Sequence, residues 1–130
     1  MLQRMHEVAS FQKNTIEEVV YYMWRTKSED RNEETLKTKK KTAADEFLRW
    51  EAYMEQRGDG SHIASKDFSM ADAVFYPHLA FAVRVGLNMT SRLPKLKAYY
   101  QMVTQRPSVQ ATWPPHWKTS EGPTMFSDVF

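Results

Sequence analysis

Histidine is the side chain in this sequence that best suits metal binding or proton transfer, because it titrates near neutral pH and its neutral ring binds metals. The chain contains His6, His62, His78 and His116. A helix that presents two metal-binding histidines on one face carries them about four positions apart, and no two of these have that spacing. We therefore expect no metal site. We expect His78, which falls on an apolar helix face, to be a hydrogen-bonded core residue.

Other catalytic groups show no local signature either. Cysteine is absent, which excludes disulfides, zinc-thiolate sites and a cysteine nucleophile within the chain. The four glycines are too scattered to form a glycine-rich phosphate loop. No Ser-His-Asp or paired-carboxylate arrangement is recognisable from spacing. The residues alone therefore predict no catalytic side chain and no bound cofactor.

Positive charge gathers at one place, Lys37, Lys39, Lys40 and Lys41, although the net charge of the chain is only +2. Such a run has two interpretations, a solvated helix face or a patch for phosphate or an anionic membrane. The first is favoured, because a net charge this small provides no broad field to attract nucleic acid. We expect no nucleic-acid partner.

Trp113 and Trp117 flank the rigid pair Pro114-Pro115. Tryptophan brings a large apolar surface with one polar N–H. One interpretation is that the two rings clamp the end of the chain to the core. The other is that they line a pocket for an apolar ligand, since such pockets are mostly apolar and aromatic.

The elements that must position these residues are helices. Apolar residues recur at steps of three and four, and strand-type alternation is missing. In the first segment this stripe consists of Met5, Val8, Ile16, Val19 and Met23, with Gln12 as its one polar break. The predicted helices cover residues 2–24, 32–56, 70–85, 92–105 or 94–105, and 107–112. The sequence therefore predicts an all-α fold of four main helices, a short helix and a tail.

The strongest local signal is Ser69-Met70-Ala71-Asp72. Ser69 is suited to cap the helix that follows, and Asp72, three positions later, can reach back to the amide of Ser69. The apolar run after it, from Ala73 to Val83, has 11 residues. A bilayer span needs about 20, so we expect no transmembrane helix. The first residues lack the apolar block of a secretory signal, so a cytoplasmic location is expected.

The order of several motifs resembles the C-terminal domain of glutathione transferases. The motifs are Phe47-Leu48-Arg49-Trp50-Glu51-Ala52-Tyr53, Ile63-Ala64, Phe68-Ser69-Met70-Ala71-Asp72, Tyr76-Pro77, Pro94-Lys95-Leu96, Ala98-Tyr99-Tyr100, Arg106-Pro107-Ser108-Val109 and Ala111-Thr112-Trp113-Pro114-Pro115-His116-Trp117. The last of them resembles the rho class, a neighbour of the theta class. The resemblance covers residues 1–117 and leaves 118–130 as a tail.

The resemblance implies a helical bundle that forms the hydrophobic-substrate-binding half of a glutathione transferase. Such enzymes conjugate glutathione to hydrophobic electrophiles in detoxification. In this family glutathione, a co-substrate, is held by an N-terminal thioredoxin-like domain, which also carries the activating residue. That domain has no counterpart in this sequence, so we expect the chain alone not to be catalytic. In this family Ser69 and Asp72 are structural.

The resemblance also implies where a substrate would bind. The first helix and the end of the chain form the substrate face, so the expected hydrophobic site consists of Phe11, Tyr22, Trp113 and Trp117. For Phe11 and Tyr22, core or dimer contacts are the alternative. The implied partners are hydrophobic small molecules, a second copy of the chain and the thioredoxin-like domain. A different function, a non-catalytic transferase-like module that binds proteins, also fits the sequence.

Overall fold

The structure, a computed structural model, describes residues 2–58, 60–89 and 91–130, and it contains helices and no strand over these ranges. The predicted all-α fold is confirmed. The elements are α1 (Leu2–Gln12), the π-helical segment η1 (Lys13–Tyr21), α2 (Tyr22–Arg25), the 3-10 turn η2 (Ser28–Asp30), α3 (Glu33–Arg57), α4 (Met70–Arg84), α5 (Pro94–Thr104), α6 (Pro107–Thr112) and α7 (Pro115–Thr119). No helix of the described residues is long and apolar enough to cross a membrane.

The predicted first helix is continuous over α1, η1 and α2, which together are called the first helical path, but its winding changes along its length. Its middle, η1, is π-helical, and the residues on either side of the change, Gln12 and Tyr22, keep right-handed helical backbone angles. Thr15 lies in η1 and is fully buried, and its hydroxyl donates to the Phe11 carbonyl at 2.6 Å. Val8, Ile16 and Val19 of the predicted stripe are buried, so helical spacing identified much of the buried face. The wider π winding moves side chains round the axis, and Thr15 and Val20 are buried as well.

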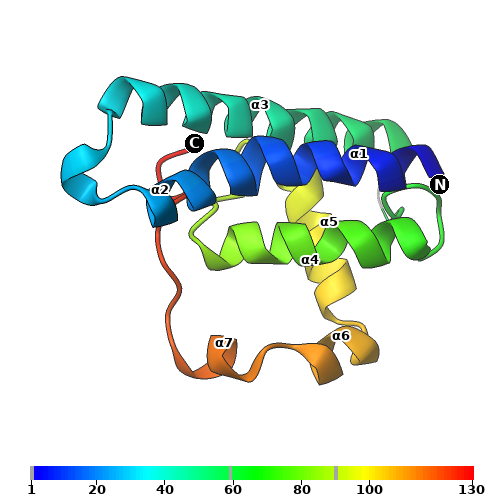
Figure 1. Ribbon diagram of the computed structural model, residues 1–130. Helices are drawn as coiled ribbons and strands as arrows, with labels where there is room; N and C mark the ends of the chain where they lie inside the picture. Colours follow the sequence, from blue (N-terminus) through cyan, green and yellow to red (C-terminus); the bar gives the residue numbers. More distant parts are fainter. Residues whose placement is uncertain (1, 59, 90) are drawn as a thin grey trace.

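The helix α3 lies along the first helical path (Figure 1), and both of its ends have a local cause. Asn32 caps its start, where the side-chain oxygen accepts a hydrogen bond from the Thr35 N–H at 3.0 Å. Gly58 ends it with a φ of +86°, a value that glycine adopts without strain. Between α3 and its neighbours lies an aromatic core, in which Trp50 stacks on Phe75 with ring centroids 4.4 Å apart.

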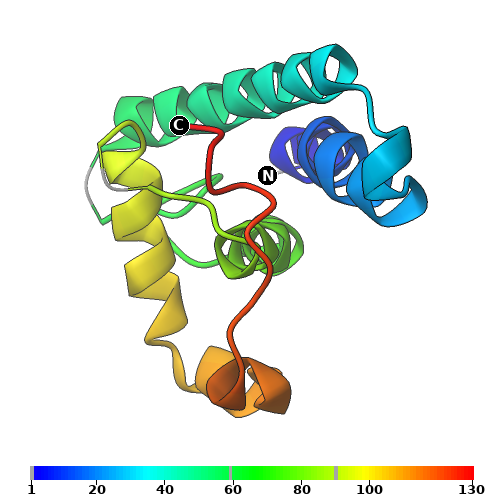
Figure 2. The same ribbon diagram turned by 90° about the vertical axis from the view of Figure 1, so that its left-hand side faces the viewer.

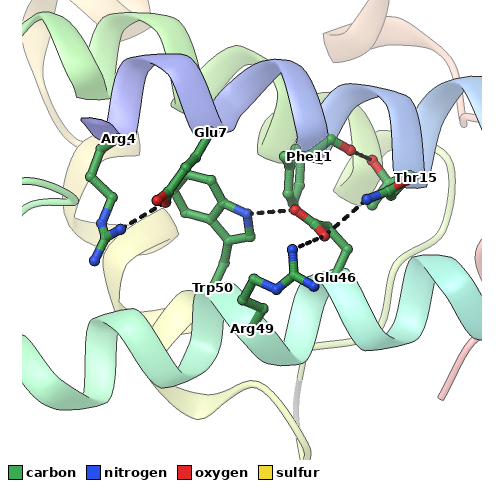
Figure 3. A network of polar contacts seen from close by, with 8 residues as sticks. Arg4, Glu7, Phe11, Thr15, Glu46, Arg49 and Trp50 are labelled. Atoms are coloured by element: carbon green, nitrogen blue, oxygen red, sulfur yellow. Dashed lines mark hydrogen bonds and ion pairs between the residues drawn. The ribbon is translucent and has the colours of Figure 1, made fainter. Parts of the chain in front are cut away.

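A buried carboxylate joins α3 to the π-helical segment (Figure 3). Glu46 is 2% exposed and accepts hydrogen bonds from the Trp50 indole at 3.0 Å and from the Asn14 amide at 3.2 Å. Arg49 forms an ion pair with it at 3.1 Å. Because a buried carboxylate without partners is costly, these contacts fix the two helices against each other.

The helix α4 runs alongside the first helical path (Figure 1) and begins directly after the predicted cap residue, Ser69. Both halves of a capping box are present between Ser69 and Asp72. The Asp72 carboxylate is fully buried and also accepts hydrogen bonds from the Ile63 N–H and the Tyr99 hydroxyl, each at 2.9 Å. One carboxylate therefore holds the start of α4, the preceding loop and α5 together.

The start of α5 is capped from another helix. The Glu51 carboxylate of α3 accepts hydrogen bonds from the N–H groups of Lys95 and Leu96, with its Oε2 atom at 3.0 and 3.1 Å. Burial raises the pKa of the Glu51 carboxyl, while the two N–H groups oppose that rise. N–H groups in the first turn of a helix have no partner within the helix. Leu93, the N-cap residue of α5, makes no side-chain cap hydrogen bond, and Glu51 supplies the acceptor in its place.

The end of the chain packs back on the bundle. Phe126 is fully buried, its ring lies 5.6 Å from that of Phe47, and its N–H donates to the Val85 carbonyl at 3.0 Å. Asp128 forms an ion pair with Lys40 of α3 at 2.8 Å. The expected boundary after residue 117 falls inside α7, and Phe126 joins the core; the division into a domain of residues 1–117 and a tail stays a prediction.

Candidate functional site

A cavity of about 450 Å³ lies between α4 and the segment formed by α6 and α7. Its lining is largely apolar and comes from the start and middle of α4, the end of α5, and α6–α7. The lining residues are Phe68, Asp72, Ala73, Tyr76, Pro77, Ala80, Val103, Ser108, Val109, Thr112, Trp113, Pro114 and Trp117. Its volume falls within the usual range of small-molecule sites.

The two tryptophans form one wall of this cavity because prolines direct the chain around them. Pro107 opens α6 and Pro115 opens α7, where proline is tolerated because its missing N–H would have no helical partner. Trp113 lies between the two short helices, and its ring meets that of Trp117 edge to face, with centroids 5.4 Å apart. Both tryptophans line the cavity, and their role in binding an apolar ligand stays a prediction.

The polar groups of the cavity are largely engaged. The carboxylate of Asp72 already accepts hydrogen bonds from the Ile63 N–H, the Ser69 N–H and the Tyr99 hydroxyl. The Tyr76 hydroxyl lies 2.6 Å from Thr104 Oγ1, and burial raises the pKa of Tyr76 to about 12, so it is neutral at pH 7. Pro77 has no N–H to donate to the Ala73 carbonyl. The lining is therefore suited to hold an apolar ligand and contains no activated nucleophile.

The other two predicted site residues lie elsewhere. Phe11 is fully buried, and its ring centroid is 5.0 Å from that of Phe75 and 5.5 Å from that of Phe47. The expectation that Phe11 binds substrate is corrected, because a core residue without exposed surface has none to offer a ligand. Tyr22 is half-buried near the start of α3, where its hydroxyl accepts from the Asn32 N–H at 3.1 Å. It does not line the cavity, and its role in binding stays a prediction.

A second, shallower hollow of about 310 Å³ lies between the first helical path and α4. It is lined by Gln12, Ile16, Tyr21, Trp24, Pro77, His78 and Phe81. Trp24 is 57% exposed and stacks on Tyr21 at 5.7 Å. His78 is only partly buried, with its Nδ1 atom 3.1 Å from the Val74 carbonyl. The predicted core position for His78 is therefore only partly right, because the residue lines this hollow.

The lysine run of α3 is mostly paired with carboxylates. Lys39 contacts Glu18 at 3.1 Å, and Lys41 contacts Asp45 at 3.1 Å, in addition to the ion pair of Lys40 at the end of the chain. The adjoining groove, of about 640 Å³, also contains Glu33, Glu34 and Asp128. Its positive and negative side chains balance, which disfavours an anion site there. Among the described residues, no three His, Asp or Glu side chains are grouped to hold a metal ion.

The comparisons with known proteins agree with the geometry. The family described as glutathione S-transferase, C-terminal domain, matches residues 13–112. Glutathione S-transferase A of Pleuronectes platessa is 38% identical over 130 residues, which make up 99% of this chain and 56% of that protein.

A solved structure is similar as well. The crystal structure of a glutathione S-transferase from the Antarctic clam Laternula elliptica matches with a TM-score of 0.88 and 36% identity, over 99% of this chain and 57% of that one. The chain therefore spans a little over half the length of these relatives. It belongs to the glutathione S-transferase C-terminal domain family.

Proposed function

We propose that this chain is the hydrophobic-substrate-binding half of a glutathione transferase, which conjugates glutathione to hydrophobic electrophiles. The observation that carries the proposal is the apolar cavity, with Trp113 and Trp117 as one wall. In such a reaction the thiolate of glutathione is the nucleophile. The cavity would hold the apolar electrophile, while glutathione and its activating residue would belong to the thioredoxin-like half. This chain alone would then bind substrate without turning it over.

The finer parts of the proposal rest on the sequence. The motif from Trp113 to Trp117 supports a rho- or theta-like class. A role in detoxification, a cytoplasmic location and a homodimer follow from the family resemblance.

Binding of a neutral apolar fluorophore tests the proposal directly. N-phenyl-1-naphthylamine brightens when it leaves water for an apolar site, so its titration yields a dissociation constant. We expect micromolar binding that is lost in Trp113→Ala/Trp117→Ala and retained in Trp24→Ala. Trp24 is the matched control, because it is exposed and lines the other hollow. Equal binding by the wild type and the double variant would refute the assignment of the cavity.

Calorimetry with glutathione tests the division of labour between the two halves. We expect no binding tighter than millimolar, because the expected glutathione site lies in the other domain. A micromolar affinity would show that this chain contains a glutathione site of its own.

The exposed aromatic surface around Trp24 favours a second function, docking of another protein or domain. Trp24 is 57% exposed and meets Phe81 of α4 edge to face at 6.2 Å. Aromatic residues are enriched where proteins bind one another. A non-catalytic interaction module would use this surface in place of the cavity. Sedimentation of the wild type against Trp24→Ala tests it, since a docking surface used by a second copy predicts self-association that the substitution weakens.

A further inference from the structure

The segment 107–119, which comprises α6, α7 and the two tryptophans, forms the tryptophan wall of the cavity and is set apart from the rest of the bundle. Figures 1 and 2 show α6 and α7 below the long helices, joined to them by the end of α5 on one side and by the C-terminal segment on the other. The space between this wall and α4 is the 450 Å³ cavity. The position of the wall therefore depends on what holds its two ends.

Arg84, at the end of α4, holds the far end of the wall. Its guanidinium donates to the carbonyl of Ser120 at 2.6 Å, to the Ser120 hydroxyl at 3.0 Å and to the Trp117 carbonyl at 3.4 Å. Its Cζ atom also lies 5.7 Å from the centroid of the Trp117 ring. The last carbonyls of a helix have no donor within it, and Arg84 supplies donors to the end of α7.

The chain passes close to this arginine immediately after α7. A Cβ atom on Gly122 would lie 2.0 Å from the Arg84 carbonyl oxygen and 2.9 Å from its side chain. Only glycine allows the backbone to approach this closely without displacing its neighbour. Arg84 is thus in contact with the end of the wall on two sides, through its guanidinium and through its backbone.

We infer that Arg84 is a positioning residue for the cavity: by holding α7 through Ser120 and Trp117, it sets the distance between the tryptophan wall and α4, and hence the affinity for apolar ligands. This inference rests on the proposed function of the cavity. Arg84 itself is not among the lining residues, so it acts through the wall and not by touching the ligand.

A control for the loss of a cation exists at the end of the chain. Arg92 also places its guanidinium over an aromatic ring of the C-terminal segment, 5.3 Å from the centroid of Phe130. That contact lies beyond the wall and involves no cavity residue. Arg84→Met and Arg92→Met therefore remove comparable cations, of which one holds the wall.

The experiment measures N-phenyl-1-naphthylamine binding together with hydrogen exchange. In Arg84→Met we expect the dissociation constant to rise about tenfold, equivalent to about 1.4 kcal/mol, and faster exchange confined to residues 107–120. Arg84→Lys, which keeps the charge but loses the fork of donors, should give a smaller change in the same direction. It also serves as the test if Arg84→Met does not fold. Arg92→Met should bind as the wild type.

The outcomes separate the inference from the proposed function. Wild-type affinity in both Arg84 variants, or an equal loss in Arg84→Met and Arg92→Met, would overturn the positioning role while leaving the cavity as a ligand site. Absence of probe binding by the wild type would refute the proposed function, and with it the inference. Weakened binding without faster exchange in residues 107–120 would also overturn it, because the wall would not have moved.

Discussion

The buried carboxylate of Asp72 is the most demanding polar group of the fold, and its removal is the sharpest test of the structure. It accepts hydrogen bonds from the Ile63 N–H at 2.9 Å, the Ser69 N–H at 2.8 Å and the Tyr99 hydroxyl at 2.9 Å. Burial and the neighbouring carboxylate raise the pKa of Tyr99, so this hydroxyl stays a donor across the accessible pH range. The substitution Asp72→Ala leaves all three donors without their acceptor.

The expected cost follows from the burial of these donors. Leaving one buried donor unsatisfied costs about 1–3 kcal/mol, and both the Ile63 amide and the Tyr99 hydroxyl are buried in these bonds. The Ser69 amide is only partly buried, so water can replace part of that bond. With two buried donors left unsatisfied at about 1–3 kcal/mol each, we expect Asp72→Ala to lower the free energy of unfolding by about 2–6 kcal/mol.

Two variants act as graded controls. Ser69→Ala removes one cap and should cost about 0.5–2 kcal/mol. Tyr99→Phe removes one hydrogen bond to a charged group, worth about 1.5–3 kcal/mol, and leaves the cap intact. Urea denaturation followed by circular dichroism measures all three. A cost of Asp72→Ala no larger than that of Ser69→Ala would show that Asp72 is only a local cap and would refute its role in joining α4 to α5.

Three further predictions concern the cap of α5 and the end of the chain. Because burial raises the folded-state pKa of Glu51 above the ordinary 4.5, the folded state holds its proton more tightly than the unfolded state. The stability that Glu51 contributes is therefore present below about pH 4.5 and is lost as pH rises through the folded pKa. Glu51→Gln should flatten this decline in a pH series of urea midpoints. An unchanged pH profile would contradict the raised pKa of Glu51. Phe126→Ala should lower the free energy of unfolding by about 3–5 kcal/mol, the range for emptying a buried aromatic position. Cutting the chain after Trp117 should expose apolar surface to a hydrophobic dye. A soluble truncated monomer that binds no dye would show that residues 118–130 cover no apolar surface.

Much of the architecture was predictable because its signals are local. The start of α4 follows from Ser69 and Asp72, which are three positions apart, and a capping box requires only that spacing. The start and end of α3 were likewise expected within a residue, since apolar periodicity and Gly58 mark them. For Trp113 and Trp117 the sequence left two interpretations open, a clamp on the core and the wall of a pocket. Both rest on the rigid Pro-Pro pair between the two rings.

The interactions that position the site join residues far apart in the chain, and spacing holds no information about them. Glu51 caps a helix that begins 43 residues later, at Pro94, and Arg84 reaches Ser120 across a separation of 36. The wrong expectation for Phe11 has the same cause. Helical spacing shows that Phe11 lies on an apolar face, but it does not show whether neighbouring helices cover that face or leave it open to a ligand. Local periodicity determined which segments are helices, whereas the packing of α3, α4 and the end of the chain decided which side chains became core and which became cavity wall.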